Sequence, residues 1–331
     1  MKRLLLNVFR LILVVVGLLY AFWGVDFGLL LATFKRYDPL AVVLALGWGG
    51  LLFFALGYRL NRLAGGRVTL GRGVVGSVLC QGFNNMLPTK LGEVAKVIYL
   101  SHHSSLSRAE ALGVVFWERF LDLNMLLLLG LLSVALLGRG ELLWPMTLVL
   151  VTFWGGLLFF AHWQGLSLRL IGFFPFAHLR NFLVELHGHI QERLGLRFVA
   201  LGGGYTLAVW LLSVAQAMLV FYLVAALPIT LLQALTVFVV ATLGLSIPST
   251  PGGIGLFEAA VVWSLGWFGI AREEALGAAV MMRMVVFVPT VLVTLWLLFS
   301  RHELGLLRLF RGEEHGNEAT SPPSQKGATD H

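Results

Sequence analysis

Three charged side chains recur at three-residue intervals within an apolar stretch of the chain: Lys90, Glu93 and Lys96. Residues three apart lie on one face of a helix, so a helix here would place a carboxylate between two ammonium groups. A charge surrounded by apolar residues is costly and usually faces a cavity or a partner. The spacing therefore predicts a buried polar site. The alternative is an interfacial segment whose long side chains reach back to water.

A second charged cluster, Glu118, Arg119 and Asp122, lies inside another apolar run. Glu118 and Asp122 are one helical turn apart and share a face, and Arg119 is three residues from Asp122, a spacing that favours an ion pair. The cluster can belong to a polar pathway or fix the packing of its helix, and the two roles are compatible. Two carboxylates could also act as general acid and base, but no nucleophile or metal set accompanies them.

A third set is the Gly-rich stretch 251–255, which lies just before Glu258. Glycine permits backbone turns that other residues resist, and the free N–H groups at a helix start attract phosphate oxygens. No strand precedes the glycines and no Walker lysine follows them, which excludes a nucleotide-binding loop. Glu258 can cap the helix, pair with Arg283 or carry a coupling proton.

The setting of these charges is a chain of 331 residues that is 58% hydrophobic and only 12% charged. Soluble domains are about 45–50% apolar, so the composition indicates a membrane protein. The net charge of +7 has no folded polar domain to carry it, which excludes nucleic acid as a partner and favours anionic lipid headgroups. The single cysteine, Cys80, excludes an intrachain disulfide, and the histidines lack metal-ligand spacing, so we expect no metal and no cofactor.

Six apolar runs are long enough, at about 20 residues, to cross a bilayer as helices. The first, Met1 to Trp23, resembles a signal peptide, but no clear small-residue cleavage site follows, so we expect an uncleaved helix. The other five predicted spans are Leu40–Tyr58, Ala109–Leu137, Leu142–Trp163, Val199–Leu227 and Ala275–Phe299.

Two further apolar segments are interrupted near their middle. Val74–Leu100 is broken at residues 84–89, and Leu231–Phe268 is broken at residues 248–253. The arms are too short to cross a bilayer alone, and irregular backbone at membrane depth needs protein or a wet cavity to satisfy its polar groups. The sequence thus predicts an all-α polytopic transmembrane helical bundle with about six full spans and two re-entrant hairpins.

The distribution of Lys and Arg orients the bundle. With both hairpins returning to their own side, 16 Lys and Arg residues, Arg59 among them, fall on the cytoplasmic side and 4 on the other. Both termini are then cytoplasmic, in a bacterial inner membrane, and the hairpins enter from opposite sides. Opposed broken helices are typical of the inverted repeats found in secondary transporters.

The remaining segments are more polar. Residues 164–198 are expected to form a cytoplasmic amphipathic segment, because apolar and charged residues alternate at helical spacing over Ala177–Arg197. Residues 312–331 are expected to be a disordered cytoplasmic tail. Residues 1–311 then form one transmembrane domain.

Taken together, the motifs resemble those of a known family. They are Asn85-x-x-Pro88-x-Lys90-x-Gly92-Glu93-x-x-Lys96, Glu118-Arg119-x-x-Asp122, Pro251-Gly252-Gly253-x-Gly255-x-x-Glu258 and Arg283, and their pattern is similar to that of the lysylphosphatidylglycerol synthase transmembrane, or flippase-like, family. The resemblance implies a module that moves lipids or lipid-linked sugars between leaflets. Full-length synthases of that family also carry a soluble aminoacyl-transfer domain, and the short tail here implies that this polypeptide is not an enzyme.

We therefore expect a phosphate-bearing headgroup to bind between the two breaks. The cargo would be a membrane phospholipid or a polyprenyl-phosphate-linked lipid. The alternative is a non-transporting scaffold that presents lipid to a glycosyltransferase or another lipid-modifying enzyme. The predicted headgroup-binding residues are Asn85, Pro88, Lys90, Gly92, Glu93, Lys96, Pro251, Gly252, Gly253 and Gly255, and the predicted intramembrane charge network is Glu118, Arg119, Asp122, Glu258 and Arg283.

Replacing Lys90 or Glu93 with Ala is expected to abolish headgroup translocation without unfolding the protein, because each change removes a charge from the predicted site. Leaflet exchange of a fluorescent phospholipid in reconstituted vesicles measures this. Unchanged transport in both variants would reject the site.

Overall fold

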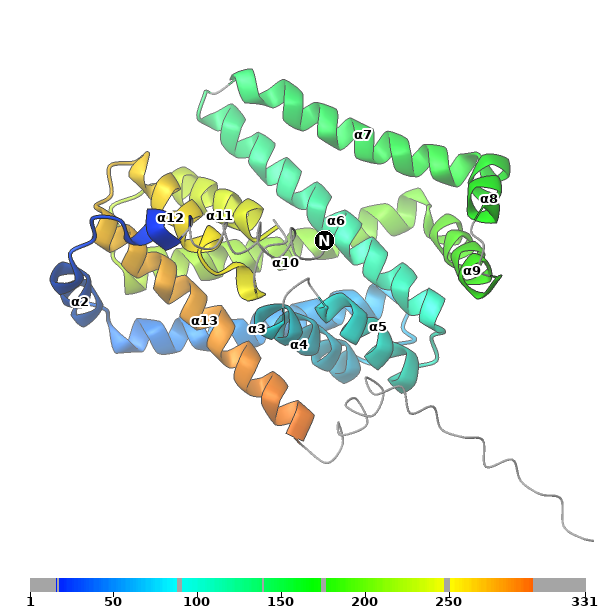
Figure 1. The fold of residues 1–331 in the computed structure, drawn as a ribbon, viewed down its shortest axis with the longest axis horizontal. Helices are drawn as coiled ribbons and strands as arrows, with labels where there is room; N and C mark the ends of the chain where they lie inside the picture. Colours follow the sequence, from blue (N-terminus) through cyan, green and yellow to red (C-terminus); the bar gives the residue numbers. More distant parts are fainter. Residues whose placement is uncertain are drawn as a thin grey trace, which may run out of the picture. The chain divides into compact units, whose positions relative to one another are not determined.

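The computed structural model describes residue 16 and residues 18–87, 91–138, 140–173, 177–246 and 251–299. These residues form helices and no strand, which confirms the predicted all-α class (Figure 1). In chain order the helices are α2 (Phe27–Lys35), α3 (Pro39–Leu63), α4 (Leu70–Met86), α5 (Gly92–His103), α6 (Arg108–Leu136), η2 (Gly140–Leu142), α7 (Leu143–His162), α8 (Gln164–Gly172), α9 (Ala177–Arg193), α10 (Leu196–Met218), η3 (Leu219–Val224), α11 (Leu231–Ser246), η4 (Pro251–Gly253), α12 (Leu256–Gly266) and α13 (Arg272–Phe299). By its contacts the chain divides into two units after Leu295, so the first unit contains the helices up to α12 and most of α13.

Among the described residues, five helices are long and apolar enough to cross a membrane: α3, α6, α7, α10 continued by η3, and α13. They confirm the last five predicted spans. The first predicted span, Met1–Trp23, lies mostly outside the described residues, as does the tail predicted at 312–331. The short helix α2, which comes after this first segment, was not predicted.

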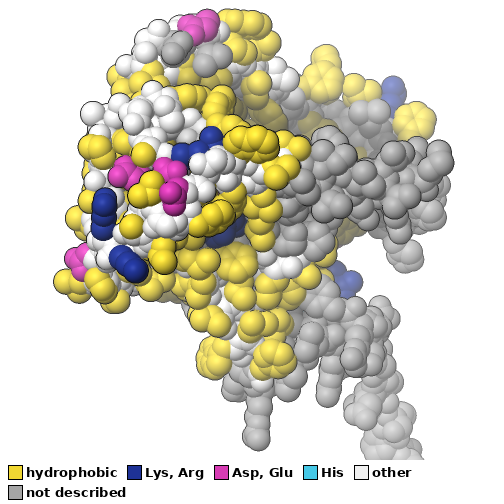
Figure 2. Space-filling view, turned by 60° about the vertical axis from the view of Figure 1, so that its left-hand side comes forward, with side chains coloured by type: hydrophobic (Ala, Val, Ile, Leu, Met, Phe, Trp, Pro, Cys, Tyr) yellow, Lys and Arg dark blue, Asp and Glu magenta, His cyan; other side chains and the backbone are white. Residues whose placement is uncertain are grey.

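The outward surfaces of these helices are apolar. In the most apolar window of α7 only 6% of the residues are buried inside the protein, and in that of α3 only 17%. Figure 2 shows a face on which hydrophobic side chains cover most of the described surface and charged ones gather in a few places. Helices this apolar and this exposed suit lipid as their surroundings rather than water.

Local signals determine where two of the spanning helices begin. Asp38 accepts a hydrogen bond from the Leu40 N–H at 2.9 Å, and Pro39 occupies the first position of α3. At the start of α6, Ser107 and Glu110 each accept a hydrogen bond from the backbone N–H of the other. These caps fix the starts of α3 and α6, the helices that carry the buried Arg59 and Glu118.

The two interrupted segments are pairs of short helices, α4 with α5 and α11 with α12. Their lengths are 17 and 12 residues and 16 and 11 residues, all below the roughly 20 that a full span needs. The helices of each pair pack against each other, and α4 also contacts η4, so the broken ends of the two pairs meet. Both segments are thus interrupted as predicted, but the first interruption begins later than expected, because α4 remains helical through Met86. Residues 88–90 and 247–250 lie outside the described part of the chain.

The predicted amphipathic segment contains α8 and α9. Helix α9 packs against α6, and its apolar side buries Ile190 in a cluster with Trp117 and Leu157. The helix expected over 177–197 is confirmed for residues 177–193; the chain then leaves the helix, and α10 begins at Leu196. His187, which was expected on the polar side, is buried.

One topological assignment is wrong. Arg59 was counted among the cytoplasmic loop residues, but α3 continues to Leu63 and Arg59 is only 1% exposed inside the bundle. It binds Glu118 and Asp122 of α6. Counting Lys and Arg near span ends cannot distinguish an arginine at the headgroups from one that is drawn inward by buried carboxylates.

Gly92 is expected to tolerate no side chain, because an added Cβ would overlap the carbonyl oxygen of Cys80 in α4. Gly92→Ala should destabilise the protein by about 1–3 kcal/mol or more through overpacking. Gly71→Ala in the first turn of α4, where a Cβ meets open space, is the matched control. Thermal unfolding in detergent checks both, and equal melting temperatures would contradict the close packing of α4 and α5.

Candidate functional site

A cavity of about 770 Å³ lies among the helices of the bundle. Its walls come from α3, α4, α6, α10, α11 and α13, with one residue each from α5 and α12, so both interrupted segments contribute to it. This volume is within the range of about 300–1,000 Å³ that is typical of small-ligand sites. The polar side chains on its wall are those of Gln81, Asn84, Asn85, Glu93, Arg119, Asp122, Ser213, Gln216, Thr242, Arg283 and Thr290.

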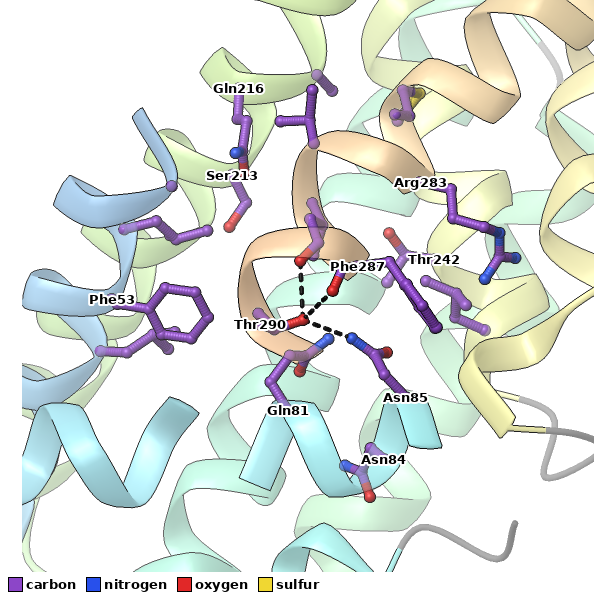
Figure 3. Close-up of a pocket in the computed structure, with 18 of the residues that line it drawn as sticks. Phe53, Gln81, Asn84, Asn85, Ser213, Gln216, Thr242, Arg283, Phe287 and Thr290 are labelled. Carbon is purple, nitrogen blue, oxygen red and sulfur yellow. Dashed lines mark hydrogen bonds between the residues drawn. The ribbon is translucent and has the colours of Figure 1, made fainter. Parts of the chain in front are cut away.

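Two adjacent amides hold the end of the first interruption. Asn85 donates its side-chain N–H to the Thr290 hydroxyl at 2.8 Å, which ties α4 to α13 across the cavity (Figure 3). Asn84 accepts from the Gly92 N–H at 2.8 Å and donates to the Glu93 carboxylate at 3.3 Å. The start of α5 is thus positioned by a side chain of α4.

The second interruption is held by a clamp between Arg283 and Glu258. The Arg283 guanidinium donates to the carbonyl oxygens of Gly252 and Gly253, at 2.8 and 3.3 Å, and to both Glu258 carboxylate oxygens. Gly252, Gly253 and Gly255 have φ values of 60°, 65° and 88°, a region that favours glycine. Of the roles that the sequence left open for Glu258, capping the helix and pairing with Arg283 are both present.

The same clamp alters the expected phosphate site at the start of α12. The Gly255 N–H, one of the donors offered to a phosphate, already donates to Glu258 at 2.8 Å. The charge of Arg283 is likewise matched by Glu258, and its side chain is only 12% exposed. At this end of the cavity the charges and the Gly255 N–H donor are therefore already paired with groups of the protein itself.

Six charged side chains of α3, α5 and α6 form one chain of ion pairs. Basic and acidic groups alternate along it, in the order Lys96, Glu118, Arg59, Asp122, Arg119 and Glu93. The nitrogen-to-oxygen distances, in the same order, are 2.6, 3.2, 2.5, 3.4 and 3.9 Å. Three positive and three negative charges balance, as low-dielectric surroundings require.

The two ends of this chain differ in exposure. Lys96 and Glu118 are 2% and 0% exposed, and neither lines the cavity. Arg119 is 49% exposed and does line it, and the Trp210 indole holds its partner Asp122 through a 3.0 Å hydrogen bond. Arg119 is therefore the described cation that the cavity presents most openly to a ligand.

The structure brings together many of the predicted site residues. Those that line the cavity are Asn85, Glu93, Arg119, Asp122, Gly252, Gly253 and Arg283. Those that lie behind its wall or pack beside it are Gly92, Lys96, Glu118, Gly255 and Glu258. Pro88 and Lys90 lie outside the described residues, and Pro251 begins η4.

Sequence reasoning missed Arg59 and Asn84. The signal for Arg59 was present, because α6 carries two carboxylates one turn apart with a single arginine beside them, which leaves one buried carboxylate in need of another cation. Asn84 carried a weaker signal, as a polar residue next to the predicted Asn85.

The fold and the cavity define a class of protein: a polytopic helical membrane protein in which two interrupted helix pairs meet at a cavity that carries polar and charged side chains on a mostly apolar wall. The family model described as the lysylphosphatidylglycerol synthase TM region matches residues 7–294, and the chain belongs to this family. The resemblance seen in the motifs is thereby confirmed, and it indicates a multi-pass membrane protein with a lipid-related function. No curated protein that was compared matches the chain.

Removing Arg59 is expected to destabilise the bundle strongly. Arg59→Gln leaves Glu118 and Asp122 buried with fewer partners, and breaking a buried ion pair from one side costs about 3–5 kcal/mol. Arg62→Gln, three residues further along α3, changes an exposed arginine bound to Tyr205 and should leave the melting temperature almost unchanged. Melting temperatures of the two purified variants test this, and similar values would show that the ion-pair chain does not hold α3 to α6.

Proposed function

We propose that this protein is a lipid transporter that moves a phosphate-bearing headgroup, of a phospholipid or a lipid-linked glycan, between membrane leaflets. The observation that carries the proposal is the convergence of both interrupted segments and of the half-exposed Arg119 guanidinium on one cavity. We place the protein in a bacterial inner membrane with both termini in the cytoplasm. A headgroup that crosses this bilayer needs a site with polar side chains, which the cavity wall supplies.

The chemistry of Arg119 suits a phosphate. A guanidinium presents its N–H donors in a planar fork that matches two phosphate oxygens, and such charge-assisted hydrogen bonds are short and strong. The amides of Gln81 and Asn85 line the same cavity and can donate to further headgroup oxygens. Figure 3 shows these two side chains close to Thr290 of α13.

The rest of the cavity suits the apolar part of a lipid. Its wall includes Phe53 and Leu56 of α3, Phe238 of α11 and Phe287 of α13. Acyl chains can remain among apolar side chains and lipid while only the headgroup follows the polar path. The scaffold alternative shares this binding site and differs in having no leaflet exchange.

The wall of the cavity also contains points at which helices can bend. Pro289 interrupts the hydrogen bonding of α13. The π-helical turn η3 continues α10, and its Val220 lies on the cavity wall. Proline and π-helical turns are common sites of helix kinks and of functional adjustment. Alternating access requires this kind of local flexibility around a central site.

Arg119→Gln is expected to slow leaflet exchange of a phospholipid about 10- to 100-fold, because hydrogen bonds to charged groups contribute about 1.5–3 kcal/mol. The measurement uses reconstituted vesicles that contain an acyl-labelled fluorescent phosphatidylglycerol. An impermeant quencher added outside removes the fluorescence of the outer leaflet, and the rate of the further loss reports leaflet exchange. Arg62→Gln, which lies outside the cavity, is the matched control and should exchange lipid like the unmodified protein.

If vesicles that contain the unmodified protein exchange the labelled phospholipid no faster than empty vesicles, the transport proposal is overturned. If, in addition, a glycosyltransferase or another lipid-modifying enzyme co-purified in stable amounts, the scaffold function would replace it.

A further inference from the structure

The charges that face the cavity are balanced before any lipid arrives. Arg119 is matched within the six-residue chain of ion pairs, and Arg283 is matched by Glu258. A phosphodiester headgroup carries one negative charge, so its entry adds one unmatched charge to the described part of the site. In surroundings of low dielectric that charge needs a partner.

The link most easily broken in the chain is the one between Arg119 and Glu93. Its atoms are 3.9 Å apart, whereas the other pairs are separated by 2.5–3.4 Å. Arg119 is also the most exposed member, so a phosphate that binds it draws it away from Glu93 first. Within the described part of the chain, Glu93 then keeps the side-chain amide of Asn84 as its hydrogen-bond donor.

The Glu93 carboxylate is already incompletely satisfied. Its Oε1 atom faces Asn84 and Arg119, but its Oε2 atom is buried and has no hydrogen-bond partner among the described residues. Glu258 differs, because Arg283 and the Gly255 N–H donate to its two oxygens. Of these two carboxylates, Glu93 is the one with a site open for a proton.

The surroundings of Glu93 come from α4, α5 and α6. The groups that face it are Arg119 of α6 and, on α4, the amide of Asn84 and the buried thiol of Cys80. Lys96 lies one turn further along α5 and is bound to Glu118, while Asp122 lies on the other side of Arg119. Lys90 is outside the described residues.

We propose that Glu93 takes up one proton each time a phosphodiester headgroup binds Arg119, so that the lipid anion and the proton cross together without net charge. This inference rests on the proposed transport function. A hydronium ion on the side where the lipid enters gives up the proton, so one of its O–H bonds breaks as an O–H bond forms at the carboxylate. When the headgroup leaves, the carboxyl O–H bond breaks and the proton returns to a water molecule.

The same carboxylate could instead bind the ammonium group of a zwitterionic headgroup. The burial of Oε2 favours the proton, since this atom has almost no exposed surface and a proton needs far less room there than an ammonium group. The two possibilities predict different responses to a pH gradient.

The test uses phosphatidylcholine vesicles that contain the full-length protein and a trace of acyl-labelled phosphatidylglycerol. Electroneutral movement of one proton with one lipid anion makes the final leaflet distribution follow the pH difference, about tenfold per pH unit, with accumulation in the leaflet facing the alkaline side. An imposed membrane potential should leave that distribution unchanged. The final distribution, rather than the rate, is the readout.

Glu93→Gln copies the protonated side chain in size and should abolish the response to the pH gradient while the melting temperature stays the same. Glu110→Gln is the matched control, because Glu110 lies outside the cavity and a glutamine can still form the cap of α6. This control should follow the pH gradient as the unmodified protein does.

Three outcomes would overturn the inference: exchange by the unmodified protein that ignores the pH gradient, a Glu93→Gln variant that still follows it, or transfer of labelled phosphatidylethanolamine that requires Glu93 and responds to no gradient. In each of these the protein still moves lipid, so the proposed function stands. Absence of exchange above that of empty vesicles would remove the proposed function and the inference with it.

Discussion

The structure depends on the requirement that charge inside an apolar bundle be paired. Arg59, Lys96 and Glu118 are almost fully buried, and each is stabilised only through its neighbours. Their pairing joins α3, α5 and α6, which are also the helices that shape one side of the cavity. Buried ion pairs contribute little net stability over apolar residues, but removal of one partner is strongly destabilising. They therefore define which helices must be neighbours.

Most of the fold could be predicted from the sequence because lipid imposes simple rules. Spans need about 20 apolar residues, and interruptions by Pro and Gly stand out against such runs. The ion pairs between Arg119 and Asp122 and between Glu258 and Arg283 were also predictable, the first from helical spacing and the second because few charges lay nearby.

The assignment of roles within the site could not be predicted in the same way. In the sequence, Lys96 and Arg119 are both basic residues within apolar segments and cannot be told apart. The packing of α5 against α6 places Lys96 next to Glu118, while Arg119 faces the cavity. Arg59 was misplaced for the same reason, since its partners are about 60 residues away in the chain. Spacing along one helix gives no information on pairing between helices.

The polar groups at the two ends of the cavity have different numbers of hydrogen-bond and ion-pair partners, and this difference bears on how a ligand would bind. At the second interruption the oxygens of Glu258 and the carbonyls of Gly252 and Gly253 have donors, so a ligand would have to displace existing bonds. At the first, Arg119 is exposed and one oxygen of Glu93 lacks a partner within the described part of the chain. A ligand gains most where the protein's own groups are least satisfied, because it displaces the fewest internal bonds. In the proposed transport, the clamped end is therefore the rigid wall of the site, and the Arg119–Glu93 end is the part that responds to the headgroup.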